Sequence, residues 1–271
     1  MRRTKGWGRF TRILLCAGFV MAAEPGLALA QAPAETPPDA RAILVGMAEF
    51  LAKTQAMSAS VQGAYDAVQT SGLKVEWNVK GTVTIRRPDR LRVESEQSNG
   101  ARSLTVFDGK EIFTFNEAAR VYAEAPQPGS VDETLVYFVR DLGIRIPLAV
   151  FFISRAPAEL NRRVKSVEYV EKTGILGAPA HHLVGSTDTV DFQVWIAAGD
   201  QPVPLHIVLT YRDAPGEPAF RGNLTWNLAA DHPDSFFTFT PPTDATRIPF
   251  LAALQKVAPG SQRTSVKKGA K

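Results

Sequence analysis

Cysteine is almost absent from this sequence of 271 residues. The single cysteine, Cys16, lies in a short apolar run at 13–23 that follows a cluster of basic residues. With Ala28 and Ala30 at the two positions that a signal peptidase reads, residues 1–30 have the pattern of a secretory signal peptide cleaved before Gln31. We therefore expect export, with the bacterial periplasm as the location that fits best. The mature chain would have no thiol, which excludes disulfides and cysteine metal ligands.

Long apolar runs and an excess of one charge are also missing. No stretch after residue 30 approaches the roughly 18 apolar residues that a membrane-spanning helix needs. The chain has 31 basic and 27 acidic residues, and residues 1–30 hold five basic and one acidic, so 26 of each remain after cleavage. The arginines at 86–92 alternate with acidic residues, which is typical of a solvated strand end. We expect no nucleic-acid partner.

Signatures of catalysis and metal binding are lacking as well. The sequence has no Gly-x-Ser-x-Gly elbow, no His-Glu-x-x-His helix and no P-loop. Of the four histidines, His181 and His182 are adjacent and would point to opposite faces of a strand. We predict no enzymatic activity, no cofactor and no metal site.

What the sequence does contain is a long alternating pattern. From residue 73 to residue 86, apolar and polar side chains take turns almost without interruption. A strand has a side-chain period of two, so the segment predicts one apolar and one polar face, over a length of roughly 46 Å. The question is whether such a strand packs only on its own protein or also on a ligand.

The rest of the chain has a helix, about five strands, a helical insertion and about five more strands. The first helix carries Ile43, Leu44 and Met47 on one face, with Thr36 as its predicted cap, and Ser130-x-x-Glu133 predicts a capping box at the start of the insertion. Short turns such as Asp108-Gly109 favour antiparallel pairing. We predict a mainly β, α+β fold. A curled antiparallel sheet of about ten to eleven strands forms an unclosed barrel, and helices plug its concave face.

The predicted boundaries follow from this order. Residues 31–38 are a flexible leader, 39–250 form a single half-barrel domain with a lid insertion at about 130–153, and 251–271 are a basic, disordered tail. The tail has five basic residues from Lys256 onward and no acidic one.

Apolar residues of the strands are the candidate binding surface, because pockets for apolar ligands commonly lie in the mouths of barrels. The alternative is that the helices fill the half-barrel and nothing else binds. The predicted lid residues are Phe138, Phe151 and Phe152. The predicted cavity lining is Val75, Trp77, Val79, Val83, Ile85, Leu104, Val106, Phe113, Phe115, Phe192, Val194 and Trp226.

Three motifs in order resemble the outer-membrane lipoprotein carriers, the LolA/LolB-like superfamily of periplasmic proteins. They are the segment from Ile85 through Arg87-Pro88 to Arg92, the Val106-Phe107-Asp108-Gly109-Lys110 turn with its following aromatic strand, and Phe-Thr-Phe-Thr-Pro-Pro at 237–242. Order and spacing agree over roughly residues 39–245. The chain most resembles a group of predicted periplasmic proteins within that superfamily, and 237–242 resemble the last core strand of the carriers.

The resemblance implies a half-barrel that holds acyl chains under a helical lid, with Arg87 latching the lid by hydrogen bonds. Its implied partners are a hydrophobic ligand or an acylated protein, bound by a monomer. A sensor module of the same fold, which contacts an envelope membrane protein, is the second interpretation. A structural protein that binds no ligand is the third.

Overall fold

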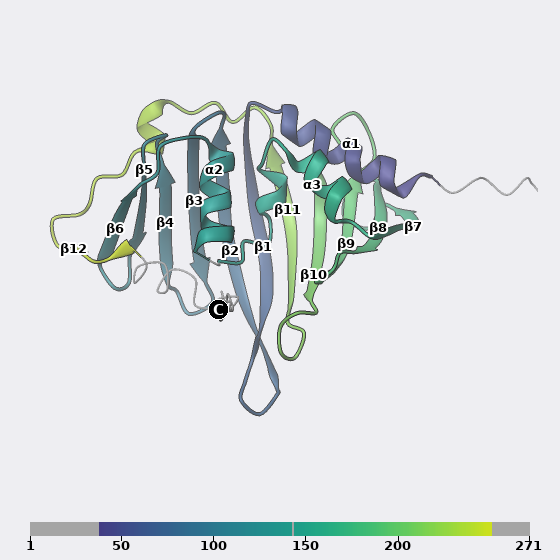
Figure 1. The fold of residues 1–271 in the computed structure, drawn as a ribbon, viewed down its shortest axis with the longest axis horizontal. Coiled ribbons are helices and arrows are strands. Elements are labelled where there is room, and N and C mark those ends of the chain that lie inside the picture. The colour runs from purple at the N-terminus through teal and green to yellow at the C-terminus, as the bar shows by residue number, and fades with distance from the viewer. Residues whose placement is uncertain (1–37, 143, 251–271) are drawn as a thin grey trace, which may run out of the picture. The chain divides into compact units, whose positions relative to one another are not determined.

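The computed structural model describes residues 38–142 and 144–250, which lie within one compact unit. The predicted signal peptide, leader and basic tail therefore lie outside the described residues, apart from Pro38. A single sheet has the strand order β12-β6-β5-β4-β3-β2-β1-β11-β10-β9-β8-β7 (Figure 1). Its strands are β1 (Ala56–Val68), β2 (Lys74–Arg86), β3 (Arg90–Gln97), β4 (Arg102–Phe107), β5 (Glu111–Asn116), β6 (Val121–Pro126), β7 (Ser166–Thr173), β8 (Ala180–Ser186), β9 (Val190–Ala197), β10 (Pro204–Tyr211), β11 (Ala219–Asn227) and β12 (Thr246–Arg247).

All neighbouring strands pair antiparallel except β12, which adds two residues parallel to β6. The two ends of the sheet, β12 and β7, do not pair with each other. The prediction of an unclosed antiparallel half-barrel is confirmed, with one short extra strand.

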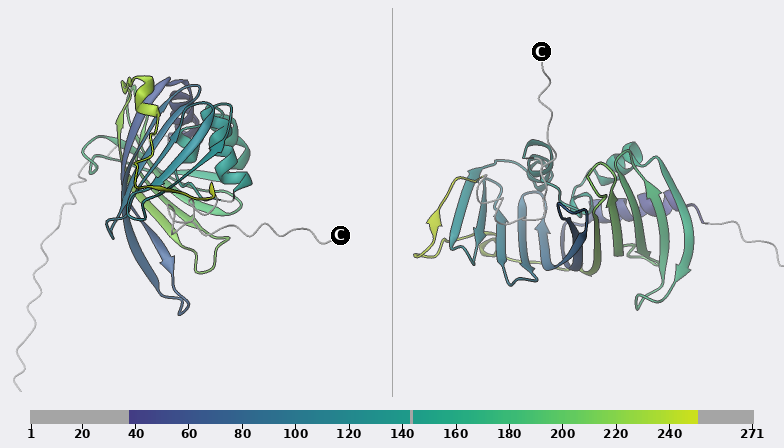
Figure 2. Two further views of the ribbon diagram at one scale, coloured as in Figure 1. Left: turned by 90° about the vertical axis from the view of Figure 1, so that its left-hand side faces the viewer. Right: turned by 90° about the horizontal axis from the view of Figure 1, so that it is seen from below.

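Helices cover one face of the sheet, which curls toward them (Figure 2). We call this the inner face and the opposite one the outer face. The helical elements are α1 (Ala40–Lys53), α2 (Val131–Val136), the π-helical turn η1 (Tyr137–Asp141), the 3-10 turn η2 (Ala149–Phe151), α3 (Ala156–Arg163) and the 3-10 turn η3 (Asp234–Phe237). Of these, α1, α2 and α3 lie on the inner face, and α1 contacts α3, β7 and β9.

The start of α1 differs from the prediction. Asp39 is the N-cap, and its carboxylate accepts hydrogen bonds from the backbone N–H groups of Arg41 (2.9 Å) and Ala42 (3.1 Å). An aspartate in this position satisfies N–H groups that have no partner within the helix. Thr36, the predicted cap, lies outside the described residues.

The long hairpin of β1 and β2 supplies the centre of the core. Met57 pairs with Ile85 and Ala59 with Val83, and paired residues of antiparallel strands point to the same face. Met57, Ala59 and Ile85 have no exposed surface, and they belong to one core with Leu44, Met47 and Leu51 of α1. Burying a large apolar side chain of this kind contributes roughly 1.5–3 kcal/mol. The hairpin extends beyond the helices, so Val75 near its tip is 42% exposed.

A second apolar cluster lies on the outer face. After β11 the chain crosses that face, and the ring of Phe239 lies 5.5 Å from Phe115, 6.3 Å from Phe113 and 6.4 Å from Tyr122. Phe237 is fully buried, with the guanidinium of Arg86 5.4 Å from its ring centre. The prediction that 237–242 form a strand is wrong. Phe237 ends η3, and residues 238–242 run over the sheet without forming a strand.

Candidate functional site

A cavity of about 360 Å³ lies between the inner face and the stretch 145–148 of the insertion. This volume is within the range of small-molecule pockets, roughly 300–1,000 Å³. The apolar residues that line it include Val61, Tyr65, Val79, Val83, Val93 and Phe220 from the strands and Ile146, Pro147 and Leu148 from the insertion. The sheet therefore supplies a mainly hydrophobic wall, and the insertion supplies the cover.

Two of the predicted lining residues, Val79 and Val83, line this cavity. Ile85 lies on the same face but is fully buried in the core. Val75 and Trp77 lie nearer the tip of the hairpin, also on the inner face, because each pairs with an inner-face residue of β1.

Three predicted residues from the second half of the chain also lie on the inner face, but inside the core. Phe192 and Val194 are 9% and 1% exposed. Trp226 packs its ring 5.9 Å from that of Phe152 and donates a hydrogen bond from Nε1 to the Pro204 carbonyl oxygen (2.7 Å). Trp226 therefore packs the insertion against the sheet.

Four predicted lining residues lie on the other face of the sheet, so their assignment to the cavity is wrong. Leu91, which pairs with the inner residue Ile85, also pairs with Phe107, and Phe107 pairs with Ile112. Phe107 and Ile112 are thus the inner residues of β4 and β5. The residues that alternate with them point outward, which places Leu104, Val106, Phe113 and Phe115 on the outer face.

The cause of the error is that β4 and β5 are apolar on both faces. The chain after β11 covers their outer face, where Val106 has no exposed surface and Phe239 packs on Phe115. Alternation within one strand cannot say which of two apolar faces points inward.

Polar groups gather at the mouth of the cavity. The guanidinium of Arg145 donates to both carboxylate oxygens of Asp213 at 3.0 Å and lies 4.7 Å from the ring centre of Tyr211. The mostly buried carboxylate of Asp66 lies on the outer face, where it pairs with Arg221 at 3.1 Å and accepts from the backbone N–H of Ala219. Sequence reasoning missed the cluster at the mouth, because the insertion, β10 and the β10–β11 loop supply its members.

Burial raises the pKa of Tyr211 to about 12, from an ordinary value near 10. The hydroxyl should therefore stay protonated in the folded protein while an unfolded chain would ionise. Below pH 10 this group leaves stability unchanged, and stability should fall as the pH rises through about 12. Ultraviolet absorbance titration should show a late-ionising tyrosine that disappears in Tyr211→Phe. A titration curve unchanged by that substitution would contradict the burial.

The insertion places its three predicted phenylalanines against the inner face. Phe138, Phe151 and Phe152 are 6%, 4% and 2% exposed and belong to the main core. The capping box at its start is present, since Ser130 Oγ accepts from the N–H of Glu133 and the Glu133 carboxylate accepts from the N–H of Ser130. The capping box predicted at the start of the insertion is thus present, and the role of the insertion as a mobile lid stays a prediction.

Arg87 links three parts of the fold. Its Nε donates to the carbonyl oxygen of Thr54 after α1 (3.1 Å), and its Nη1 pairs with Asp132 of α2 (3.4 Å). Burial lowers the pKa of Arg87, and the charge of Asp132 opposes that shift. Asp132 in turn accepts hydrogen bonds from the backbone N–H and the hydroxyl of Ser154, at 2.7–3.0 Å. One carboxylate therefore joins both ends of the insertion to Arg87, which is where a latch would have to lie.

The family of predicted periplasmic proteins DUF2092 matches residues 40–251. The chain belongs to this family. The expected resemblance to a group of periplasmic proteins is thus confirmed. No curated protein matches the sequence.

Several solved structures are similar to the chain at low identity. An uncharacterized conserved protein of Thermus thermophilus is 13% identical, with 76% of this chain and 96% of that chain covered and a TM-score of 0.44. Lipoprotein LppX of Mycobacterium tuberculosis is 13% identical, with 69% and 97% covered and a TM-score of 0.41. A LolA superfamily protein of Nitrosomonas europaea is 12% identical, with 74% and 97% covered and a TM-score of 0.37. At sequence identities this low, similarity to these structures concerns the fold and not the ligand of this protein.

The two adjacent histidines of this family member point to opposite faces of the sheet. His181 pairs with Ile196 on the inner face and lies near Tyr169, whereas His182 pairs with Trp195 on the outer face. Residues 38–142 and 144–250 contain no group of three or more histidine, cysteine or acidic side chains that could hold a metal. Nor does any helix in these ranges have the length and hydrophobicity to cross a membrane.

Proposed function

We propose that the protein is a periplasmic binding protein that holds a hydrophobic ligand, such as an acyl chain or the lipid of an acylated protein, in the inner-face cavity. The observation that carries the proposal is the cavity itself. Valines and aromatic rings of β1, β2, β3 and β11 supply most of its lining, and Arg145 supplies a charged group beside them. A long apolar tail fits the wall, and a polar head fits the mouth.

The cover of the cavity supports the same proposal. Leu148 both lines the cavity and belongs to the core, so the insertion is part of the binding wall. A ligand longer than the cavity would have to displace apolar side chains of the insertion, in competition for one surface. The joint formed by Arg87, Asp132 and Ser154 would then limit how far the cover moves.

The test is native mass spectrometry of the protein after expression with its leader, together with extraction and analysis of bound lipid. We expect a co-purified lipid in the unaltered protein and its loss in Val79→Asp, because a carboxylate in an apolar wall opposes an acyl chain. Val79→Trp, which fills the cavity without adding charge, should also empty it. Asn78→Asp changes the neighbouring residue on the outer face and should leave the lipid in place.

Thermal unfolding of each variant separates a lost site from a lost fold. Equal lipid content in all four folded proteins, or no lipid in any after incubation with phospholipid vesicles, would contradict the proposal. The helices would then fill the half-barrel and the cavity would be unused. Capture of an inner-membrane protein by an unlipidated sample would instead favour the sensor interpretation.

A further inference from the structure

A continuous row of polar and aromatic side chains crosses the outer face. Each member lies directly opposite the next on the neighbouring strand, from β7 through β11 and β1 to β4. The row, in spatial order, is Glu171, His182, Trp195, His206, Asn223, Gln62, Lys80, Glu96 and Arg102. With strands roughly 4.8 Å apart, these nine residues span roughly 38 Å across the sheet. We call them the outer row.

Contacts between neighbours fix the side chains of the outer row. The rings of His182 and Trp195 stack at 3.9 Å, and that of His206 meets Trp195 edge-on at 4.8 Å. His206 Nδ1 lies 2.7 Å from Asn223 Oδ1. Such pre-positioned groups lose little conformational freedom when they bind a partner.

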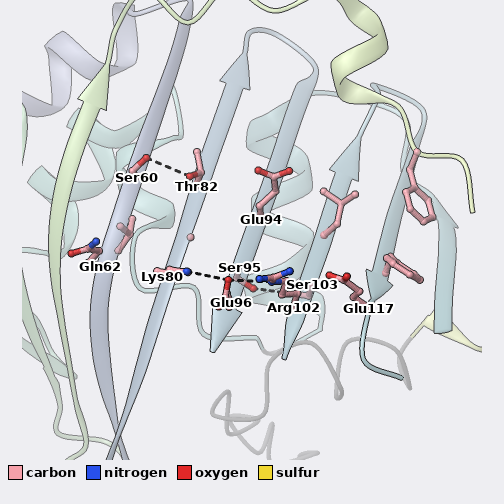
Figure 3. Close-up of a pocket in the computed structure, with 15 residues that line it drawn as sticks. Ser60, Gln62, Lys80, Thr82, Glu94, Ser95, Glu96, Arg102, Ser103 and Glu117 are labelled. Atoms are coloured by element: carbon pink, nitrogen blue, oxygen red, sulfur yellow. Dashed lines mark hydrogen bonds and ion pairs between the residues drawn. The ribbon is translucent and has the colours of Figure 1, made fainter. Parts of the chain in front are cut away.

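The other half of the row is charged but balanced. The carboxylate of Glu96 forms ion pairs with Lys80 (3.1 Å) and with Arg102 (3.1 Å). Figure 3 shows these three side chains and Gln62 on adjacent strands, one beside the next. Hydrogen bonding from Lys80 lowers the pKa of Glu96, so it remains a carboxylate. With Glu171, the row has two charges of each sign.

Two hollows follow this row. They have volumes of about 580 and 590 Å³ and share Gln62, Lys80 and Glu96, so they adjoin. At its far end the first hollow reaches the rings of Phe115 and Phe239. Aromatic rings therefore lie on both sides of the polar, charge-balanced part of the outer row: Trp195 on one side, and Phe115 and Phe239 on the other.

The chemistry of the row restricts the partner. Balanced charge gives no general attraction for a polyanion such as a nucleic acid. An extended peptide binds most often by pairing with a free strand edge, whereas eight of the nine strands here are paired on both sides. An acyl chain would leave the polar groups without partners.

A sugar chain satisfies every one of these conditions. Its hydroxyl groups both donate and accept, as the amides, imidazoles and carboxylate of the row require. Its C–H groups pack on aromatic surface, which the row offers at the part of the half-buried His182, Trp195 and His206 group that these rings leave uncovered by one another. One sugar of an extended β-1,4-linked chain is about as long as one strand spacing, roughly 4.8 Å. We propose that the outer row binds a neutral, extended, β-linked polysaccharide strand. This site is on the face opposite the proposed lipid cavity and does not depend on it.

Titration calorimetry of the full chain purified after export, with N-acetylchitohexaose and with cellohexaose, tests the proposal. We expect binding of at least one hexasaccharide, and a loss of about fivefold or more in affinity for Trp195→Ala, since an aromatic contact is worth on the order of 1 kcal/mol beyond its buried area. Gln62→Ala, at an exposed amide, should weaken binding without a risk to folding. The matched control Thr225→Ala, on the outer face of β11 but off the row, should bind within about twofold of the unaltered protein.

Pull-down with insoluble peptidoglycan and with cellulose distinguishes the two sources of such a chain. Absence of binding to both hexasaccharides and both solids would overturn the proposal. So would unchanged affinity in both Trp195→Ala and Gln62→Ala. Stronger binding to dextran sulfate that falls steeply with salt would show a polyanion site instead and would equally overturn it.

Discussion

Replacing Asp132 by alanine should lower the free energy of unfolding by about 3–5 kcal/mol, the usual cost of leaving one partner of a buried ion pair without the other. The side chains of Arg87 and Asp132 are only 9% and 17% exposed. The substitution also removes the hydrogen bonds that tie Ser154 to the start of the insertion. Urea denaturation measures the change, and hydrogen exchange of 130–153 should become faster.

Replacing the other partner of the pair, Arg87, should lower the free energy of unfolding by a smaller amount. In Arg87→Leu, Asp132 keeps its hydrogen bonds from Ser154, and Arg87 Nη2, which is buried without a partner among the described residues, is removed. We expect roughly half the loss of Asp132→Ala. A loss equal to or above that of Asp132→Ala would contradict the view that Asp132 is the centre of the joint. The control is Asp141→Ala, which breaks an exposed pair with Arg140 and should leave the urea unfolding curve nearly unchanged.

Truncation of Phe152 to alanine should cost about 3–5 kcal/mol, as is usual for a buried phenylalanine. Its ring packs against Trp226 and it is 2% exposed. The new space would lie on the inner face between the insertion and β11. Calorimetric unfolding gives the change in stability.

Val139→Ala provides the matched control, because Val139 lies in the same insertion but is 41% exposed. It should change stability by no more than about 0.5 kcal/mol. A loss below about 1 kcal/mol for Phe152→Ala would mean that the insertion is loosely packed and that its core is elsewhere.

The sequence was most informative where a local pattern had one interpretation. The alternation at 73–86 predicts β2, and the structure has that strand at Lys74–Arg86. Ser130 and Glu133 predict the start of the insertion, because a capping box is a property of four consecutive residues. The half-barrel follows from many amphipathic strands joined by short turns, with too few helices to cover a flat sheet.

The sequence could not show which face of each strand points to the inner side of the sheet. Val106 and Phe107 are adjacent and both fully buried, one on each face, and only the pairing of Phe107 with Leu91 decides which points inward. The outer row escaped prediction for the same reason. Trp195 and Lys80 are far apart in sequence, and nothing local shows that four strand pairings connect them.

The open ends of the sheet bear on how the protein could accommodate ligands of different size. In a closed barrel, strand number and stagger together fix the circumference, so the interior cannot widen without breaking a ladder of hydrogen bonds. Here β12 and β7 are not paired with each other, and no such constraint exists. The twist between neighbouring strands can change by a few degrees at each of eleven pairings while every ladder stays intact. Small changes of angle summed over so wide a sheet would move its two edges apart, so a change of curvature would add to the space that displacement of the insertion opens on the inner face.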